Sequence, residues 1–132
     1  MKKQINVVGA VIVRDARILC AQRGSAGSLP HLWEFPGGKI EAGETPREAL
    51  AREITEELEC QVEVGDHVDT TTYEYDFGTV TLTTYYCELI AGTPRLTEHA
   101  SVRWLPPEDL ASLDWAPADI PAIEKIQHKL SV

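Results

Sequence analysis

The alternation of apolar and polar residues predicts a chain built largely of β-strands. Alternating, apolar or β-branched runs predict strands over residues 5–13, 17–22, 32–35, 61–74, 79–90 and 102–105. Arg14-Asp15 between the first two runs favours a hairpin, and Pro36-Gly37-Gly38 after the third is typical of a turn.

Two helices are predicted among these strands. The first runs from Pro46 to about Leu58, because Thr45 can cap it, proline fits its first position and Glu48 can close a capping box. The second runs over 120–130, where apolar residues recur at helical spacing. This mixture favours an α/β fold with a mixed sheet between helices.

Composition narrows the possible partners. A chain of 132 residues is expected to form a single domain over 1–132 without disulfides or a structural metal. Its formal net charge of −9 repels phosphate backbones, so we expect no nucleic-acid polymer as partner, although a small anion accompanied by divalent cations is compatible. The N-terminal apolar run is too short for a membrane span, and Cys20, Cys60 and Cys87 are expected to be reduced core thiols. We therefore expect a cytoplasmic protein with no membrane association and no obligate protein partner.

Seven of the 21 acidic residues fall between residues 41 and 59. Because successive helical residues turn by about 100°, Glu56 lies about 60° to one side of Glu53, and Glu57 about 40° to the other. An apolar stripe must face the core beside this arc, formed by Leu50, Ile54 and Leu58. The three carboxylates therefore lie at the edge of the buried face.

Two interpretations of this cluster are open. Runs of charge are usually solvated, and neighbouring arginines could relieve the repulsion. Alternatively, the carboxylates hold hard divalent cations, which prefer oxygen ligands. Gly37 and Gly38 allow close approach of the backbone to a ligand, and Lys39 suits a phosphate. A phosphate site beside carboxylates is what metal-assisted phosphoryl chemistry needs, which favours the second interpretation.

The same stretch resembles the signature of the Nudix hydrolase family. That signature has glycine, five residues, glutamate, seven residues, then Arg-Glu-apolar-any-Glu-Glu-any-Gly-apolar. Here it reads Gly38, Glu44 and Arg52-Glu53-Ile54-Thr55-Glu56-Glu57-Leu58-Glu59-Cys60. Only the late glycine departs, and Glu59 in its place leaves open how the helix ends. The AQR triplet, the run WEFPGGKIEAGETP, the tyrosine-rich strand and APADIP extend the resemblance, most closely to the MutT and CTP pyrophosphohydrolase branch.

The resemblance implies an α/β/α sandwich and Mg²⁺-dependent hydrolysis of a small-molecule nucleoside triphosphate to the monophosphate and pyrophosphate, with Mn²⁺ able to substitute. Carried over by position, it implies metal ligands at Glu53, Glu56, Glu57, Glu98 and the carbonyl of Gly37 or Gly38, phosphate contacts at Arg23 and Lys39, and supporting roles at Arg52 and Glu44. Glu53 is favoured to orient or deprotonate the attacking water.

Base recognition is expected near the last helix. Phe35 and Tyr75 are candidates to stack on a base, although aromatic residues on strands usually belong to the core. Asp119 either caps the last helix or accepts a hydrogen bond from a base edge, such as the exocyclic amine of cytosine. In the MutT branch an asparagine at this position recognises oxidised guanine. The aspartate at this position resembles that of the CTP-type relatives, so the expected substrate is 8-oxo-dGTP, or CTP or dCTP and their modified forms.

Two rival functions remain. The chain could cleave a nucleoside diphosphate derivative such as ADP-ribose, although it has no long insertion. It could also be a non-catalytic Nudix module that binds a nucleotide, but such modules usually lose signature glutamates, and this sequence retains them.

Overall fold

The structure, a computed structural model, describes residues 3–95 and 99–130. Its strands are β1 (Gln4–Arg14), β2 (Arg17–Gln22), β3 (Trp33–Glu34), β4 (Gly37–Lys39), β5 (Gln61–Tyr75), β6 (Gly78–Ala91) and β7 (Ser101–Leu105). Its helices are α1 (Pro46–Leu58) and α2 (Ile120–Leu130), with 3-10 turns at η1 (Pro107–Ser112) and η2 (Pro117–Asp119). The predicted helices and strands are therefore present at or within a few residues of their expected bounds.

Strand β1 is the centre of a mixed sheet. It runs parallel to β6 along almost its whole length, from Gln4 opposite Thr79 to Val13 opposite Glu88. On its other edge it pairs antiparallel with β4 near its N-terminal end and with β2 near its C-terminal end. β5 extends the sheet beyond β6, while β3 and β7 both pair with β2. The predicted mixed sheet is confirmed.

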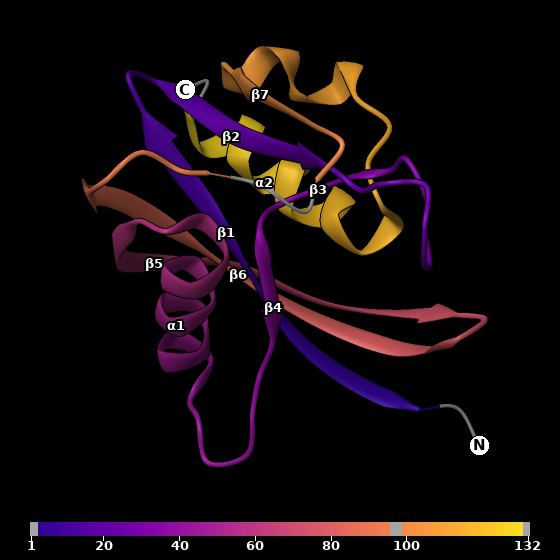
Figure 1. The fold of residues 1–132 in the computed structure, drawn as a ribbon. Coiled ribbons are helices and arrows are strands. Elements are labelled where there is room, and N and C mark those ends of the chain that lie inside the picture. Colours follow the sequence, from indigo (N-terminus) through magenta and orange to yellow (C-terminus); the bar gives the residue numbers. More distant parts are fainter. Residues whose placement is uncertain (1–2, 96–98, 131–132) are drawn as a thin grey trace.

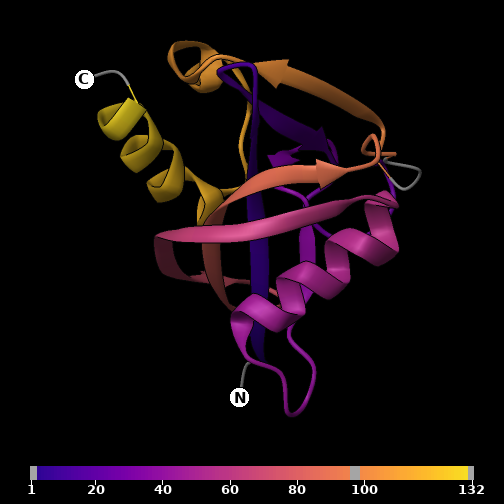
Figure 2. The same ribbon diagram turned by 90° about the vertical axis from the view of Figure 1, so that its left-hand side faces the viewer.

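The two helices cover opposite faces of this sheet (Figure 2). Side chains of β1 alternate between the faces, because successive residues of a strand point in opposite directions. Ala10 and Ile12 belong to the core under α1, where Leu50 and Ile54 are fully buried. Val11 belongs to the core under α2. The expected α/β/α sandwich is therefore what the chain forms.

One local prediction was wrong: Gly37 and Gly38 form a strand, not a turn. They pair with β1, with Gly37 opposite Gly9 and Gly38 opposite Val8, and only Pro36 lies at a bend. A Cβ on Gly37 would stand 1.9 Å from the carbonyl oxygen of Val8. Glycine is needed here because two backbones approach closely, a contact between residues far apart in the sequence.

The three cysteines are buried and free, as expected. Within the described ranges, neither helix is long and apolar enough to cross a membrane.

Candidate active site

Helix α1 is positioned by a capping box and a buried stripe. The Thr45 hydroxyl accepts a hydrogen bond from the Glu48 N–H, and the Glu48 carboxylate accepts one from the Thr45 N–H. Leu50, Ile54 and Leu58 are fully buried, as the spacing predicted. Helix α1 lies beside β4 (Figure 1), and the Glu53 carboxylate, beside this stripe, lies against Gly38 of β4.

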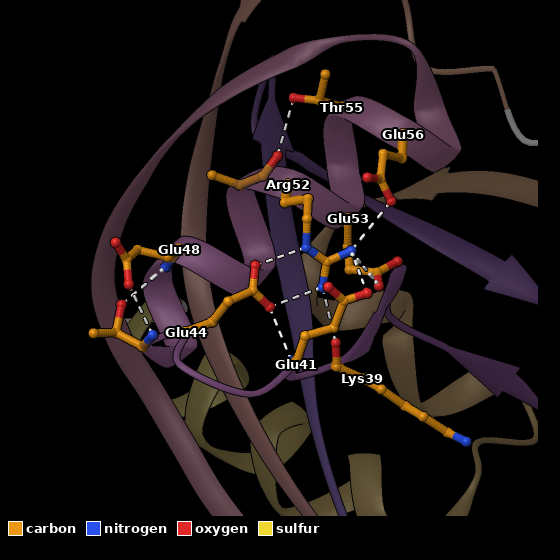
Figure 3. Close-up of polar contacts among 10 residues, drawn as sticks. Lys39, Glu41, Glu44, Glu48, Arg52, Glu53, Thr55 and Glu56 are labelled. Carbon is orange, nitrogen blue, oxygen red and sulfur yellow. Dashed lines mark hydrogen bonds and ion pairs between the residues drawn. The ribbon is translucent and has the colours of Figure 1, made fainter.

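The guanidinium group of Arg52 lies at the centre of these carboxylates (Figure 3). Its Nη1 donates to Oε1 of Glu53 at 3.0 Å and to Oε2 of Glu56 at 3.1 Å. Its Nη2 donates to the carbonyl oxygen of Lys39 at 3.1 Å, which ties α1 to β4. The Arg52 guanidinium thus holds two of the three α1 carboxylates of the signature, Glu53 and Glu56, side by side.

Glu44 fixes the other side of the same guanidinium. Nε and Nη2 of Arg52 donate to its two carboxylate oxygens at 2.7 and 2.9 Å, a bidentate arrangement that fixes both groups. The Glu41 N–H also donates to Glu44. Hydrogen bonds from the Arg52 side chain and the Glu41 N–H lower the pKa of Glu44. The carboxylates of Glu44, Glu53 and Glu41 in turn raise the pKa of Arg52. Glu44 therefore contacts Arg52 and orients it towards the other glutamates.

Gly38 leaves the space that the Glu53 carboxylate occupies. A Cβ at position 38 would lie 2.4 Å from the carboxyl carbon and from Oε2 of Glu53. The Glu53 side chain is only 13% exposed, whereas that of Glu56 is 61% exposed. The β4 backbone and the Glu53 carboxylate are therefore in direct contact, and Glu56 faces solvent beside them.

The donor groups here are of the types that a hard cation prefers. Carboxylate oxygens and a glycine backbone lie within one small region, and Glu57 and Gly37 line one polar pocket of about 240 Å³. The described residues include no group of three or more His, Cys, Asp or Glu side chains arranged around a common ion position, and Glu53 and Glu56 are both bound to Arg52. Glu98 lies outside the described residues.

A second pocket, of about 360 Å³, extends from β4 to η2, the turn just before α2. Each residue predicted to contact phosphate or base lines it: Arg23, Lys39, Phe35, Tyr75 and Asp119. Gly37 and Gly38 line it too. The Lys39 side chain points away from the carboxylate cluster (Figure 3). The structure thus joins the base-reading candidates and the glycine strand in one continuous cavity.

Asp119 is a buried acid within this pocket. It is 6% exposed, and its Oδ2 accepts a hydrogen bond from the Phe35 N–H at 3.1 Å. Burial is the main cause that raises the pKa of Asp119 to about 8; the nearby Glu34 carboxylate adds to this effect, and the Phe35 hydrogen bond and Arg23 oppose it. Its carboxyl group therefore keeps its proton to a much higher pH than an exposed aspartate does. The bond to Phe35 joins it to the β3–β4 connection, not to the first turn of α2.

The two aromatic candidates differ in their surroundings. Phe35 is 4% exposed and packs on Trp115 with ring centroids 4.8 Å apart, so most of it belongs to the core. The Tyr75 hydroxyl accepts a hydrogen bond from the Ala118 N–H at 2.9 Å, and burial raises the pKa of Tyr75. Both residues are rigid walls of the pocket.

Sequence reasoning missed Glu34 and His99. Arg23 donates to Glu34 at 2.8 Å, and Nε2 of His99 lies 3.1 Å from its other oxygen. Burial raises the pKa of Glu34, but His99 and Arg23 together bring it below its usual range. The sequence signal is an acid between two large aromatic residues of a predicted strand, Trp33 and Phe35, both of which are buried. Such an acid points to the opposite face and could have indicated a basic partner there. Arg23 also donates to the Ser28 carbonyl, so it is held from two sides.

Comparison with known proteins identifies the class of protein that this fold and site define. The NUDIX domain family matches residues 3–126, so the chain belongs to the Nudix family, whose hydrolases act on small nucleotide substrates and generally need a divalent metal. The sequence resemblance is therefore confirmed.

Individual relatives indicate the branch of the Nudix family to which this chain belongs. The CTP pyrophosphohydrolase of Escherichia coli K12 is 40% identical over 122 residues, covering 92% of this chain and 90% of that protein. The 8-oxo-dGTP diphosphatase of the same organism is 32% identical over 128 residues, covering 97% and 99%. A solution structure of the protein described as DNA mismatch repair protein MutT from methicillin-resistant Staphylococcus aureus 252 is 59% identical, with a TM-score of 0.82 and coverage of 98% and 99%. The chain therefore belongs to the MutT and CTP pyrophosphohydrolase branch.

Proposed function

We propose that this protein is a Mg²⁺-dependent pyrophosphohydrolase that converts nucleoside triphosphates to monophosphates and pyrophosphate. Its substrates are 8-oxo-dGTP, or CTP and dCTP with their modified forms. By cleaving them, it removes modified nucleotides from the nucleotide pool. The observation that carries the proposal is the single pocket that begins at the Gly37–Gly38 strand and ends at the buried acid Asp119. A nucleotide in this pocket would have its base near Asp119 and its phosphates near the α1 carboxylates.

In this proposal the carboxylates of Glu53, Glu56 and Glu57, with a β4 carbonyl, hold the cation. The bound cation would offset the charge of the triphosphate and make a bound water a better nucleophile. Glu53, packed against the β4 backbone, orients that water and accepts its proton. Glu98, which belongs to the same proposed ligand set, comes from outside the described residues.

Other residues of the chain orient this machinery. Arg52 keeps Glu53 and Glu56 together, and Glu44 keeps Arg52 in place. Lys39 and Arg23 line the pocket and would contact the phosphates. Arg23 has hydrogen bonds to Glu34 and Ser28, so its guanidinium is already oriented before a substrate binds.

Neutral Asp119 supports the substrate choice. A protonated carboxyl group offers one donor and one acceptor, so it complements a base edge with a donor beside an acceptor. The amine and adjacent ring nitrogen of cytosine form such an edge, and so do the protonated N7 and adjacent O6 of 8-oxoguanine. The two acceptors at N7 and O6 of unoxidised guanine do not match it.

The test is a panel of normal and oxidised nucleoside triphosphates, with ADP-ribose included, incubated with the protein and Mg²⁺. We expect monophosphate plus pyrophosphate from at least one cytidine nucleotide or from 8-oxo-dGTP. Release of orthophosphate, preference for ADP-ribose, or no turnover in the panel would contradict the proposal.

Variants at position 38 test whether the β4 backbone serves catalysis through Glu53. Gly38→Ala should lower kcat by roughly 10- to 100-fold, the usual effect of displacing a residue that supports a metal ligand, because the added Cβ meets the Glu53 carboxylate. Glu53→Gln should lower it further. The double variant should be no slower than Glu53→Gln, since both changes affect one group. Glu63→Gln, at an exposed glutamate of β5 that lines neither pocket, is the matched control and should retain activity.

A further inference from the structure

The turn of the β5–β6 hairpin carries an exposed aromatic ring. Tyr75 and Gly78 pair, so Asp76 and Phe77 form a two-residue connection between the strands. Such connections usually contain glycine, asparagine or aspartate. Phe77 is 44% exposed, although a ring of this size favours burial. The hairpin end projects from the body of the molecule at the right of Figure 1.

Phe77 is also a wall of the pocket that contains Asp119. Its ring lies almost parallel to that of Tyr75, with centroids 5.1 Å apart and an angle of 7° between the planes. Tyr75 is itself held by the hydrogen bond from Ala118 and by contact with Tyr73, whose ring centroid is 4.6 Å away. The exposed ring is therefore supported from behind by a fixed one.

We propose that Phe77 stacks on the nucleobase and thereby sets the affinity of the pocket for nucleotides. This inference rests on the proposed function, because it needs a nucleotide in the same pocket. The rings of bases and aromatic side chains attract each other through their faces, with little dependence on which base is present. Phe77 therefore contributes affinity for any nucleoside, while Asp119 selects among bases through its hydrogen bonds. Binding of a base also covers apolar surface of Phe77 that is otherwise exposed.

Tyr73 offers a matched control on the same hairpin. It is 41% exposed and, like Phe77, its ring contacts that of Tyr75. Unlike Phe77, it is not among the residues that line the pocket. Removing either ring deletes a similar exposed aromatic group and a contact with Tyr75. Only removal of Phe77 takes a wall from the pocket.

The experiment compares Phe77→Ala, Phe77→Trp and Tyr73→Ala in steady-state kinetics on CTP and 8-oxo-dGTP, and in calorimetric binding of CMP and dGMP. Phe77→Ala should raise KM by roughly five- to tenfold for whichever triphosphates are cleaved, with kcat changed less than twofold, and should weaken binding of both monophosphates similarly. Phe77→Trp should retain or improve affinity, because it keeps a stacking face. Tyr73→Ala should match the parent within twofold.

Equal affinity in Phe77→Ala and the parent, or equal losses in Phe77→Ala and Tyr73→Ala, would overturn the inference. A loss confined to one base would also overturn it, because stacking is tolerant of base identity. The two proposals fail differently. Absence of triphosphate cleavage by the parent refutes the proposed function, while weaker monophosphate binding by Phe77→Ala still supports the stacking role. If the parent neither cleaves a triphosphate nor binds either monophosphate, both proposals are refuted.

Discussion

Asp119 brings together deep burial and a carboxyl group, and this combination makes its charge depend on pH near neutrality. Its pKa is raised from 3.8 to about 8, chiefly by burial. Between these values the folded state binds more protons than the unfolded state, so this residue contributes less stability as pH rises from about 4 to 8, and the loss is complete above pH 8. The ionised form also presents two acceptors to a base instead of a donor and an acceptor.

Exchange of Asp119 for asparagine tests this account, because the amide keeps an acceptor for the Phe35 N–H and cannot ionise. The stability difference, Asp119→Asn minus parent, should be larger at pH 9 than at pH 5. We expect this increase in free energy of unfolding to exceed about 1.4 kcal/mol, the equivalent of one pKa unit. Denaturant titrations at each pH measure it. The parent's ratio of kcat/KM between CTP and 8-oxo-dGTP should change across pH 8, whereas the variant's ratio should stay constant. Parallel pH profiles for the two proteins would contradict a raised pKa at Asp119.

The C-terminal end of α1 shows how one residue can terminate an element under strain. The family signature has glycine where this chain has Glu59, and Glu59 adopts the left-handed conformation that a glycine would take, with φ 53° and ψ 36°. For a residue with a Cβ this conformation costs roughly 1–2 kcal/mol. The helix therefore ends after Leu58, as the glycine would dictate, although the sequence alone left that end open.

Glu59→Gly should raise the free energy of unfolding by about 0.5–1 kcal/mol, since relief of the strain exceeds the entropy that glycine adds to the unfolded chain. Loss of the exposed ion pair with Arg95, at 3.6 Å, should matter little. Urea denaturation measures the change. Glu59→Ala is the control, because alanine keeps the strain, and it should not be stabilised. A stabilised alanine variant would show that the Glu59 side chain, not its backbone, is the source of the strain.

At this same scale, the elements differ in how well local sequence predicts them. Helix α1 was predictable because its capping box, its proline and its apolar stripe all lie within its own residues. Strand β4 was not, because Gly37 and Gly38 read as a turn until β1 is placed beside them. The contacts of Arg52 were partly predictable for the same reason: its glutamates lie on its own helix or just before it.

The molecule as a whole assembles the pocket from parts of the chain that the sequence keeps far apart. Asp119 and Phe35 are 84 positions apart and share a hydrogen bond, and Tyr75 is fixed by Ala118 from 43 positions away. Family resemblance pointed to these residues, but no local pattern could show that Phe77 and Glu34 join them. Which residues line a pocket depends on tertiary packing, above all on how the α2 end of the chain is docked on the sheet.

An ion pair between an exposed lysine and a buried aspartate links α2 to the sheet. Nζ of Lys125 on α2 lies 2.5 Å from Oδ1 of Asp69 on β5, and the Thr71 hydroxyl donates to the other oxygen. Burial alone would raise the pKa of Asp69, which is 5% exposed, but the hydrogen bonds from Lys125 and Thr71 hold it below its usual range. A lowered carboxyl pKa contributes stability above its ordinary range, and that contribution is lost as pH falls through the folded-state value.

Lys125→Met should therefore lower the free energy of unfolding by about 1–3 kcal/mol at pH 7, because it leaves a buried carboxylate with one partner removed. The loss should shrink when the pH is lowered to about 3, where the unfolded state already favours protonated carboxyl groups. Adding Asp69→Asn to the same variant should recover part of the stability, since no charge then remains buried. Asp66→Asn removes the acid of an exposed pair, 3.9 Å from Lys129, and should change stability by less than about 0.5 kcal/mol. Urea denaturation at the two pH values measures all four proteins, and equal losses from Lys125→Met at both would show that its methylene chain, rather than its charge, docks α2.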